Sequence, residues 1–414
     1  MRQMNWGGNL DYGVSEVAAP RSIDELATEI AKGRLRPLGT RHSFSQVAMP
    51  NTRLVTATEI PANPVLDEAN RTVTVGAGTR FGELAIFLEE NGWALANMGS
   101  LPHISIAGAA ATGTHGSGDD HPILSSSIRS FEYLNADSEL IKVSRGDSDF
   151  EICRLGLGAY GFWVRVTLDI QPSYLVRQDV FRDIPWDAVL ENLDSVMGAG
   201  YNVSMFTDWL GRGVEQTWVK TRIDQAEPPS SLHGVKADSA SQDSFEEGSE
   251  SNLTVQGGVP GPWLLRLPHF RLDATPSAGD EIQTEYFVLR EHATAAMKAI
   301  RSIAHEIKPA LILSEIRSIA GDGAWLSPMH RGDSIALHFT WKLLQAEVDE
   351  AISKVESVLR QFNAIPHWGK LNQISKPELE RLFPKLEQAR NRFDELDPEG
   401  IFNSPALQKL GVRS

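Results

Sequence analysis

The sequence predicts an α+β protein with two domains. Its 414 residues are enough for two or three domains at about 150 residues each. Helix and strand signals alternate through the first half, and the composition shifts at Gln171-Pro172, after which the alternation is lost. We therefore predict a first domain over residues 1–172, a second domain of mixed α/β architecture over residues 173–375, and a helical, charged segment over residues 376–414 that returns to the first domain.

The first half begins with a helix signal. Ser22 and Glu25 form a capping-box pattern, in which each side chain bonds to the orphan amide of the other residue. Downstream, the pattern predicts strands at 35–38 and 72–75, a helix at 81–90, and turn-rich segments at 39–45 and 76–78. This order is typical of βαβ units.

Glycines and other small residues dominate residues 98–118. We expect this stretch to form little core of its own. Glycine and alanine let the backbone approach a ligand closely, and consecutive N–H groups can form a concave site for an anion. Three strands are predicted after it, at 127–134, 139–144 and 161–170.

The second half mixes strands and helices around a polar insertion. Strands are predicted at 203–209, 215–222, 282–289, 311–319 and 334–342, helices at 292–307, 346–362 and 377–396, and a long surface insertion at 224–258. In the strand at 334–342, large apolar side chains alternate with polar ones, so His338 and Thr340 share the polar face. Glu315 and Arg317 likewise share one face, about 7 Å apart. Taken alone, that pair reads as a solvated ion pair on an edge strand.

Charge and cysteine content exclude several classes of function. The chain has 39 Lys and Arg against 54 Asp and Glu, a net charge of −15, which disfavours nucleic acids and anionic membranes as partners. Cys153 is the only cysteine, so neither an intrachain disulfide nor a cysteine-rich metal site is expected, and we predict no metal. With no signal-peptide or membrane-spanning pattern, we expect a cytoplasmic protein.

Two loops have the composition of a cofactor site. The segment Gly76-Ala77-Gly78 lacks the third glycine of a dinucleotide fingerprint, and no P-loop motif occurs. The loops at 37–45 and 99–118 are both dense in backbone donors. Together they could wrap one long, phosphate-bearing cofactor.

Five motifs resemble those of the alditol oxidases, a family of FAD-dependent oxidases of the vanillyl-alcohol-oxidase type that is related to the sugar-1,4-lactone oxidases. The motifs are PLGTRHSF at 37–44, SLPHIS at 100–105, GTHG at 113–116, EIR at 315–317 and HWGK at 367–370. The resemblance extends from about Trp6 to the last predicted helix. It implies a two-domain fold, with a PCMH-type FAD-binding domain followed by a substrate, or cap, domain.

The resemblance also implies the residues of the site. His42 would carry FAD through a bond from its ring to the flavin 8α carbon, although Arg41 stands where the family usually has glycine. The residues implied to contact FAD are Pro37, Leu38, Gly39, Thr40, Arg41, His42, Ser43, Ser105, Ala110, Gly113, Thr114, His115, Gly116, Gly158, Gly161, Phe162, Thr340 and Lys370. For His115, its neighbours favour loop packing over proton transfer.

A polyol site is implied at the distal motifs. Substrate would contact Ser105, Glu315, Arg317, Thr340 and Lys370, and the catalytic residues would be Lys370, His338, Glu315 and Arg317. Without the resemblance, Lys370 reads as an exposed loop lysine, although its aromatic and glycine neighbours could hold the amine partly out of water and lower its pKa.

The activity implied is oxidation of the terminal C1 hydroxyl of alditols such as xylitol and sorbitol to the aldose, with O2 reduced to H2O2. The expected partners are therefore a small polyol and O2, and the default assembly is a monomer. A sugar-1,4-lactone oxidase or dehydrogenase is the alternative, because it would share the FAD domain and differ in the cap.

Overall fold

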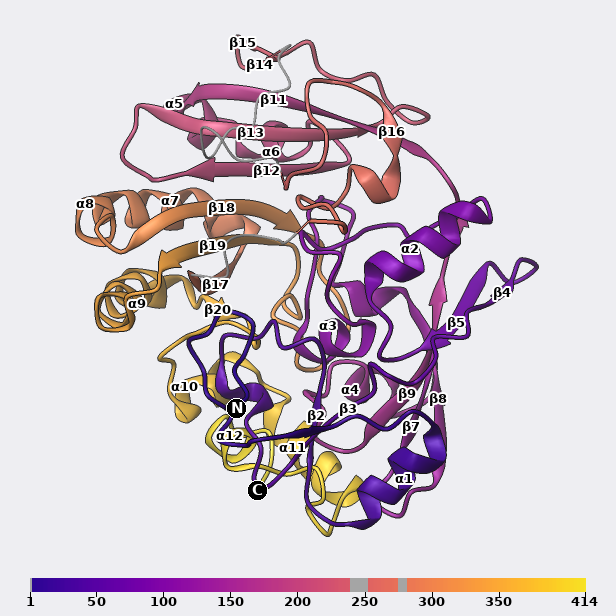
Figure 1. Ribbon diagram of the computed structural model, residues 1–414. Coiled ribbons are helices and arrows are strands. Elements are labelled where there is room, and N and C mark those ends of the chain that lie inside the picture. The colour runs from indigo at the N-terminus through magenta and orange to yellow at the C-terminus, as the bar shows by residue number, and fades with distance from the viewer. Residues whose placement is uncertain (1, 239–251, 275–280) are drawn as a thin grey trace.

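Two groups of sheets, one from the first part of the chain and one from its middle, lie side by side (Figure 1). The computed structural model describes residues 2–238, 252–274 and 281–414. The predicted insertion at 224–258 therefore lies partly outside the described residues. Its described part includes a short hairpin of β14 (Ser231–Leu232) and β15 (Val235–Lys236).

The first part of the chain contains a small parallel sheet and a five-stranded antiparallel sheet. The parallel sheet has the order β1 (Val17–Ala18), β3 (Leu54–Thr56), β2 (Arg36–Leu38). The antiparallel sheet has the order β4 (Val65–Asp67), β5 (Thr72–Gly76), β9 (Phe162–Asp169), β7 (Ile128–Leu134), β8 (Leu140–Ser144). The helices of this part are α1 (Ile23–Ala31), α2 (Phe81–Glu90), α3 (Ile106–Thr112) and α4 (Phe150–Cys153).

Helix α1 begins at the predicted cap, but only half of the capping box forms. The Ser22 hydroxyl accepts a hydrogen bond from the Glu25 N–H at 3.1 Å. The Glu25 carboxylate accepts from the Arg21 N–H at 2.7 Å instead of from Ser22. The predicted start of the helix is therefore confirmed, and its reciprocal bond is shifted by one residue.

Helix α3 corrects the expectation that residues 98–118 form a loop with little core. Its Ile106, Ala109 and Ala110 are buried in the largest apolar core of the described chain. Alanine has the best helix propensity, and its small side chain permits close packing. The helix ends at Gly113, whose φ of 75° lies in the left-handed region that glycine tolerates.

An eight-stranded antiparallel sheet forms the middle of the chain. Its order is β16 (Gly261–Pro262), β11 (Leu175–Pro185), β13 (Gly213–Arg222), β12 (Asn202–Thr207), β18 (Leu311–Ile319), β19 (Ser334–Lys342), β17 (Glu281–Leu289), β20 (Ile365–Pro366). The two-stranded pair β6 (Trp93–Ala94) and β10 (Gln171–Pro172) ties the predicted boundary dipeptide to the first part of the chain.

Helices cover one face of the eight-stranded sheet (Figure 1). They are α5 (Trp186–Glu191), α6 (Leu193–Met197), α7 (Ala293–Ser302), α8 (Ala304–Ile307) and α9 (Gln345–Leu359). Leu337, Phe339 and Trp341 of β19 are buried in the core beneath them. The alternating side chains of the same strand, including His338 and Thr340, point to the opposite face, where a cavity lies.

The last helices pack against the first part of the chain (Figure 1). They are α10 (Lys376–Leu382), α11 (Leu386–Leu396) and α12 (Pro405–Lys409), and short 3₁₀ helices occur at η1 (Gln46–Ala48), η2 (Leu124–Ser127), η3 (Trp263–Leu265), η4 (Arg290–His292) and η5 (Arg360–Phe362). Phe393 of α11 stacks on Tyr160 with ring centroids 5.5 Å apart. The buried Arg413 donates hydrogen bonds to Asp397 and to the carbonyl of Ala159, next to Gly158.

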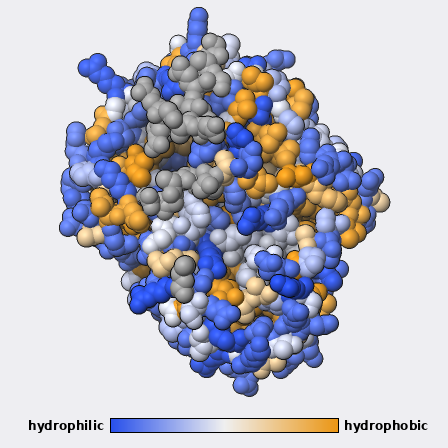
Figure 2. Space-filling model, viewed as in Figure 1, coloured by the Kyte–Doolittle hydropathy of each residue, from blue (hydrophilic) through white to orange (hydrophobic). Residues whose placement is uncertain are grey.

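The surface seen in Figure 2 is mostly hydrophilic, and its apolar residues lie in scattered groups. Within the ranges that the structure describes, no helix combines the length and hydropathy needed to cross a bilayer.

Candidate active site

A cavity of about 620 Å³ runs between the His42 loop and the polar face of the eight-stranded sheet. One end is lined by the loop after β2, by α3 and by the segment around Gly158. The other end is lined by Glu285, Glu315, Arg317 and His338. The structure therefore brings the loop motifs and the distal motifs of the sequence to one cavity.

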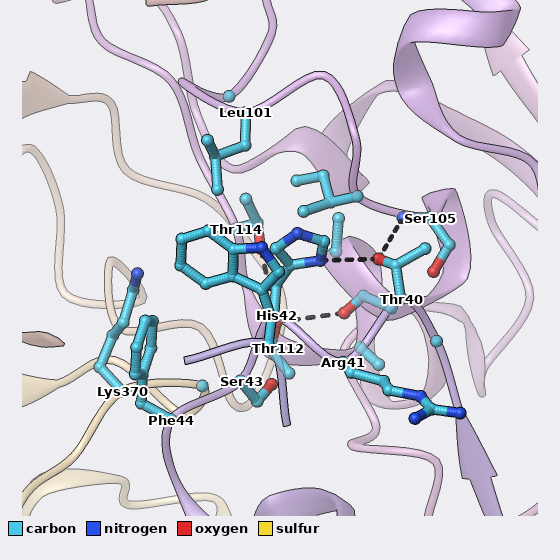
Figure 3. Close-up of a pocket in the computed structure, with 18 of the residues that line it drawn as sticks. Thr40, Arg41, His42, Ser43, Phe44, Leu101, Ser105, Thr112, Thr114 and Lys370 are labelled. Carbon is cyan, nitrogen blue, oxygen red and sulfur yellow. Dashed lines mark hydrogen bonds between the residues drawn. The ribbon is translucent and has the colours of Figure 1, made fainter. Parts of the chain in front are cut away.

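His42 is held on both sides at the first end of the cavity. Its Nδ1 lies 3.0 Å from the Thr40 hydroxyl, which also accepts a hydrogen bond from the Ser105 N–H at 3.2 Å (Figure 3). Trp6 stacks on the imidazole with centroids 5.4 Å apart. Burial, with His103 and Lys370 nearby, lowers the pKa of His42 to about 4, so the ring is neutral near pH 7.

Arg41, the residue before His42, has a backbone conformation that glycine adopts more easily. Its φ is 67°, in the left-handed region where a side chain is strained. The strained conformation is held by two contacts: its carbonyl accepts from the Trp6 N–H at 2.8 Å, and its guanidinium donates to Gln3 Oε1 at 2.8 Å. The loop thus keeps a glycine-like backbone with arginine in place.

The residues around Ser105 fit a closely held cofactor. A Cβ atom on Gly39 or Gly108 would lie 2.6 or 2.8 Å from Ser105 Oγ, so a side chain at either position would push the Ser105 hydroxyl out of its place. Among the described residues, this buried hydroxyl has no hydrogen-bond partner, although it lines the cavity. Buried hydroxyls are normally paired, so a bound group offering a polar atom here would complete it. FAD therefore fits the residues present.

Most of the residues implied to contact FAD line the cavity. They are Pro37, Leu38, Gly39, Thr40, Arg41, His42, Ser43, Ser105, Thr114, His115, Gly158, Gly161, Phe162, Thr340 and Lys370. Ala110, Gly113 and Gly116 are not among the lining residues. Ala110 faces the apolar core, Gly113 ends α3, and Gly116 packs so closely that a Cβ would lie 2.4 Å from the Met98 carbonyl.

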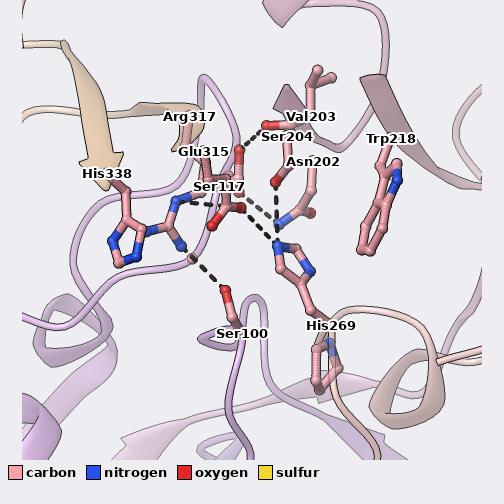
Figure 4. Close-up of polar contacts among 12 residues, drawn as sticks. Ser100, Ser117, Asn202, Val203, Ser204, Trp218, His269, Glu315, Arg317 and His338 are labelled. Carbon is pink, nitrogen blue, oxygen red and sulfur yellow. Dashed lines mark hydrogen bonds and ion pairs between the residues drawn. The ribbon is translucent and has the colours of Figure 1, made fainter. Parts of the chain in front are cut away.

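Glu315 and Arg317 are buried at the other end, with only 7% and 5% of their surfaces exposed, so the reading as a solvated surface pair is wrong. Arg317 Nε lies 3.6 Å from Glu315 Oε1, and its Nη1 donates to Ser100 Oγ at 3.3 Å (Figure 4). Burial alone would raise the pKa of Glu315, but Arg317 and His269 outweigh it and hold that pKa below its usual range. Glu315 is therefore a carboxylate at neutral pH.

Glu285 was not singled out by the sequence analysis, yet it joins the two ends of the cavity. Its carboxylate accepts from Arg317 Nη2 at 2.6 Å and lies 3.2 Å from His115 Nε2 and 3.5 Å from His338 Nδ1. His115 comes from the GTHG motif, and the other partners come from the sheet. Alternation in the sequence could have pointed to Glu285. Gln283 and Glu285 lie two residues apart in β17 and therefore share one face of the strand.

Lys370 and His338 are two titratable side chains that line the cavity. Burial lowers the pKa of Lys370 to about 8, in line with the sequence expectation, and its amine donates to Gln283 Oε1. Burial also lowers the pKa of His338, whose Nε2 lies 3.3 Å from the Thr340 hydroxyl. A neutral imidazole and an amine that titrates near physiological pH can both take part in proton transfer.

Lys220 and His269, which the sequence analysis also missed, lie behind Glu315. His269 Nε2 is 2.7 Å from Glu315 Oε1, and Lys220 Nζ is 3.1 Å from His269 Nδ1. His269 follows η3 in a loop with no local pattern, so its burial beside a strand residue could not be read from the sequence.

Comparison with known sequences decides the family. The FAD binding domain family matches residues 14–144, and the D-arabinono-1,4-lactone oxidase family matches residues 280–410. An alditol oxidase from a Streptomyces species is 39% identical over 98% of each chain. The chain belongs to the alditol oxidase family. It is therefore an FAD-dependent oxidoreductase that acts on CH–OH groups, and the resemblance carried by the five motifs is confirmed.

Matches at lower identity also extend over almost the whole chain. An L-gulono-1,4-lactone dehydrogenase from Mycobacterium tuberculosis is 27% identical, with 96% of each chain covered. Among solved structures, cholesterol oxidase from Brevibacterium sterolicum has a TM-score of 0.79 at 14% identity, covering 99% of this chain and 96% of that one. Glucooligosaccharide oxidase from Acremonium strictum has a TM-score of 0.74 at 14% identity, covering 99% and 94%. These likenesses confirm the predicted α+β fold of the vanillyl-alcohol-oxidase type.

Proposed function

We propose that this protein oxidises the terminal C1 hydroxyl of alditols such as xylitol and sorbitol to the aldose, with O2 reduced to H2O2, and that its FAD is bound covalently through His42. The observation that carries the proposal is the shared cavity: the histidine loop lies at one end with the Lys370 amine beside its Phe44, and a buried acid and guanidinium lie at the other. The related Streptomyces protein is named an alditol oxidase, which supports the same substrate class.

The covalent link is supported by how His42 is held. The Thr40 hydroxyl and the Trp6 ring fix the imidazole, and its lowered pKa keeps it neutral, as a nucleophilic ring nitrogen must be. The glucooligosaccharide oxidase of A. strictum is described as carrying a 6-S-cysteinyl, 8α-N1-histidyl FAD. In this chain the only cysteine is Cys153; burial raises the pKa of its thiol and so disfavours the thiolate that a cysteinyl bond would need, and we propose attachment through histidine alone.

The polar end of the cavity suits a neutral, hydroxyl-rich substrate. The Glu315 carboxylate accepts hydrogen bonds from hydroxyls, whereas the Arg317 guanidinium donates to them. Ser105 and Thr340 position the reacting end. With several donors and acceptors in fixed places, the site can orient a flexible polyol chain before reaction.

Lys370 and His338 assist the loss of the proton from the substrate hydroxyl. The neutral Lys370 amine accepts the proton from the C1 hydroxyl, and Gln283 holds that amine in place. His338, neutral because of its burial, orients the Thr340 hydroxyl toward the same end. FAD, when bound, supplies the acceptor for the hydride that leaves C1.

A lactone substrate is the second candidate, favoured by one specific finding. The D-arabinono-1,4-lactone oxidase family matches residues 280–410, which include Glu315, Arg317, His338 and Lys370. A lactone offers fewer hydroxyls than an alditol of equal length, so it would use fewer of the donors and acceptors around Glu315.

Oxygen uptake and peroxide release test the two candidates side by side. The purified holoenzyme is given xylitol, sorbitol or L-gulono-1,4-lactone in air. We expect one H2O2 per O2 with the alditols and a much lower rate with the lactone. A higher rate with the lactone would favour the second candidate, and alditol oxidation with an added dye but not with O2 would make the enzyme a dehydrogenase.

The covalent link has its own test. Acid precipitation should leave flavin attached to the wild-type chain, whereas His42→Ala should release all of its flavin into the supernatant. Flavin that stays attached to His42→Ala would place the bond on another residue.

A further inference from the structure

Lys220 and His269 form a buried pair on the side of Glu315 away from Arg317 (Figure 4 shows His269 beside Glu315). Lys220 is a residue of β13 with 2% of its surface exposed, and His269 is 7% exposed. A buried lysine is rare unless its charge is balanced by partners. The mechanism above uses neither residue.

The acceptors around Lys220 match an ammonium group. Its Nζ lies 2.5 Å from the Leu267 carbonyl, 3.4 Å from the Pro268 carbonyl and 3.1 Å from His269 Nδ1. An ammonium has three N–H groups and no acceptor, so each of these three atoms takes one hydrogen. Burial lowers the pKa of Lys220 to about 7, and Glu315 partly opposes that shift.

These contacts settle the tautomer of His269. The Glu315 carboxylate can only accept a hydrogen bond, so the proton of the neutral imidazole is on Nε2, which lies 2.7 Å from Glu315 Oε1. Nδ1 is then left to accept from Lys220. Burial, together with Lys220, lowers the pKa of His269 to about 4, so the ring is neutral. Lysine therefore donates to histidine, and histidine donates to glutamate.

The contacts of Glu315 leave one of its oxygens for a ligand. Within the described chain, both His269 and Arg317 approach Oε1, and the residue lines the cavity. The His269 loop is also tied to the SLPHIS motif, since the His269 N–H donates to the Ser100 carbonyl at 3.0 Å. Ser100 in turn contacts Arg317 through its hydroxyl.

We propose that Lys220 and His269 are positioning residues that hold Glu315 by Oε1 and present Oε2 to a substrate hydroxyl remote from the reacting carbon. The inference rests on the proposed function, since it names which polyols this site favours. A polyol long enough to reach Glu315 gains this hydrogen bond, and a short diol does not. The pair therefore sets a preference for longer alditols.

The tautomer can be read without any substrate. The full-length holoenzyme is labelled with ¹⁵N-histidine, and the signals of His269 are identified by their loss in His269→Gln. We expect the Nε2–H tautomer in the wild type and, in Lys220→Met, a shift of the Nδ1 signal that marks the loss of its hydrogen bond from Lys220. A wild-type Nδ1–H tautomer, or an unchanged Nδ1 signal in Lys220→Met, would overturn this chain of hydrogen bonds from Lys220 through His269 to Glu315.

Substrate preference tests whether Lys220 and His269 favour longer alditols. The ratio of kcat/KM for xylitol to that for 1,2-propanediol is measured in Lys220→Met and His269→Phe, and we expect it to fall about tenfold, mostly through KM for xylitol. His269→Gln should restore most of the ratio, because its amide can donate from about the position of Nε2. Equal losses for both substrates, or no rescue by glutamine, would contradict the proposal.

A matched control separates positioning from damage to the sheet. Gln178 is buried on β11 directly opposite Lys220 in register, so Gln178→Met should leave the substrate ratio unchanged. A fall in that ratio equal to the fall in Lys220→Met would assign the effect to the sheet. If the wild type oxidises no alditol, the proposed function fails. The NMR measurement on His269 alone then decides whether Lys220, His269 and Glu315 form this chain of hydrogen bonds.

Discussion

Burial sets the protonation of the residues that meet at the cavity, and Lys370 shows the consequence most clearly. Its pKa is lowered to about 8, so the amine becomes neutral as the pH rises through that value. If the neutral amine accepts the hydroxyl proton, kcat/KM for xylitol should rise with pH and level off above about 8. A steady-state pH profile checks this, and a flat profile would contradict the role.

Removing the Lys370 amine should abolish that rise and lower kcat by about 10²-fold or more. Lys370→Met is the test variant. Lys308→Met is its control, because that lysine pairs with Asp208 at the surface. A Lys370→Met enzyme with wild-type turnover would transfer the role to His338.

Arg41 allows the strain of a left-handed residue to be measured directly. Arg41→Ala and Arg41→Gly both lose the hydrogen bond to Gln3, but only glycine adopts a φ of 67° without strain. We expect the glycine variant to have the higher free energy of unfolding, by about 1 kcal/mol, in urea titrations. Equal stability of the two variants would mean that the loop relaxes.

At the residue scale, sequence motifs account for only part of the site. Glu315, Arg317 and Lys370 lie in short motifs that a resemblance can identify. Glu285 and His269 become visible only when strands and loops distant in the sequence are packed together. Burial also reverses the ordinary reading of Glu315 and Arg317, because a pair that looks solvated in sequence lies inside the protein.

At the scale of elements, alternate side chains of a strand have different roles: those on one face pack in the core, and those on the other line the cavity. Leu337 is fully buried under the helices, so Leu337→Ala should lower the free energy of unfolding by about 2–5 kcal/mol. Thr340, three residues along on the opposite face, lines the cavity. Thr340→Ala should lower stability by less and raise KM for xylitol. Urea titration and steady-state kinetics on both variants check this; the reverse ranking would place the strand's core on the other face.

Regular elements with strong periodicity were predictable, and the exceptions have physical reasons. The pattern predicts α2, β18 and β19 with their observed ends. It misses β11, because that strand carries Arg177, Gln178 and Asp179 in place of an apolar alternation, and both Gln178 and Asp179 are nevertheless buried. Helix α3 was missed because its glycine and alanine residues match a loop as well as a helix.

At the scale of the whole molecule, the last residues support the cofactor end of the cavity. Arg413, 2% exposed, bonds to Asp397 at 2.8 Å and to the Ala159 carbonyl, and Arg36 donates to the carbonyls of Gly158 and Phe402. Arg413→Met leaves the buried Asp397 carboxylate with two backbone N–H donors but without its positive partner, so we expect a loss of about 3–5 kcal/mol in unfolding free energy. Arg392→Met, at a partly exposed bridge to Asp149, should lose about 1 kcal/mol or less. Similar losses in the two variants would show that the last residues do not stabilise the cofactor end of the cavity.

The shared cavity joins the two halves of the chain into one active site, and anaerobic mixing of the holoenzyme with xylitol tests that claim most directly. We predict that the visible flavin absorbance is bleached in a single phase whose rate saturates with xylitol concentration, and that Glu315→Gln requires far more xylitol for the same rate. If xylitol leaves the flavin fully coloured, or if Glu315→Gln is bleached as readily as the wild type, the cavity does not unite flavin and polyol in the way described.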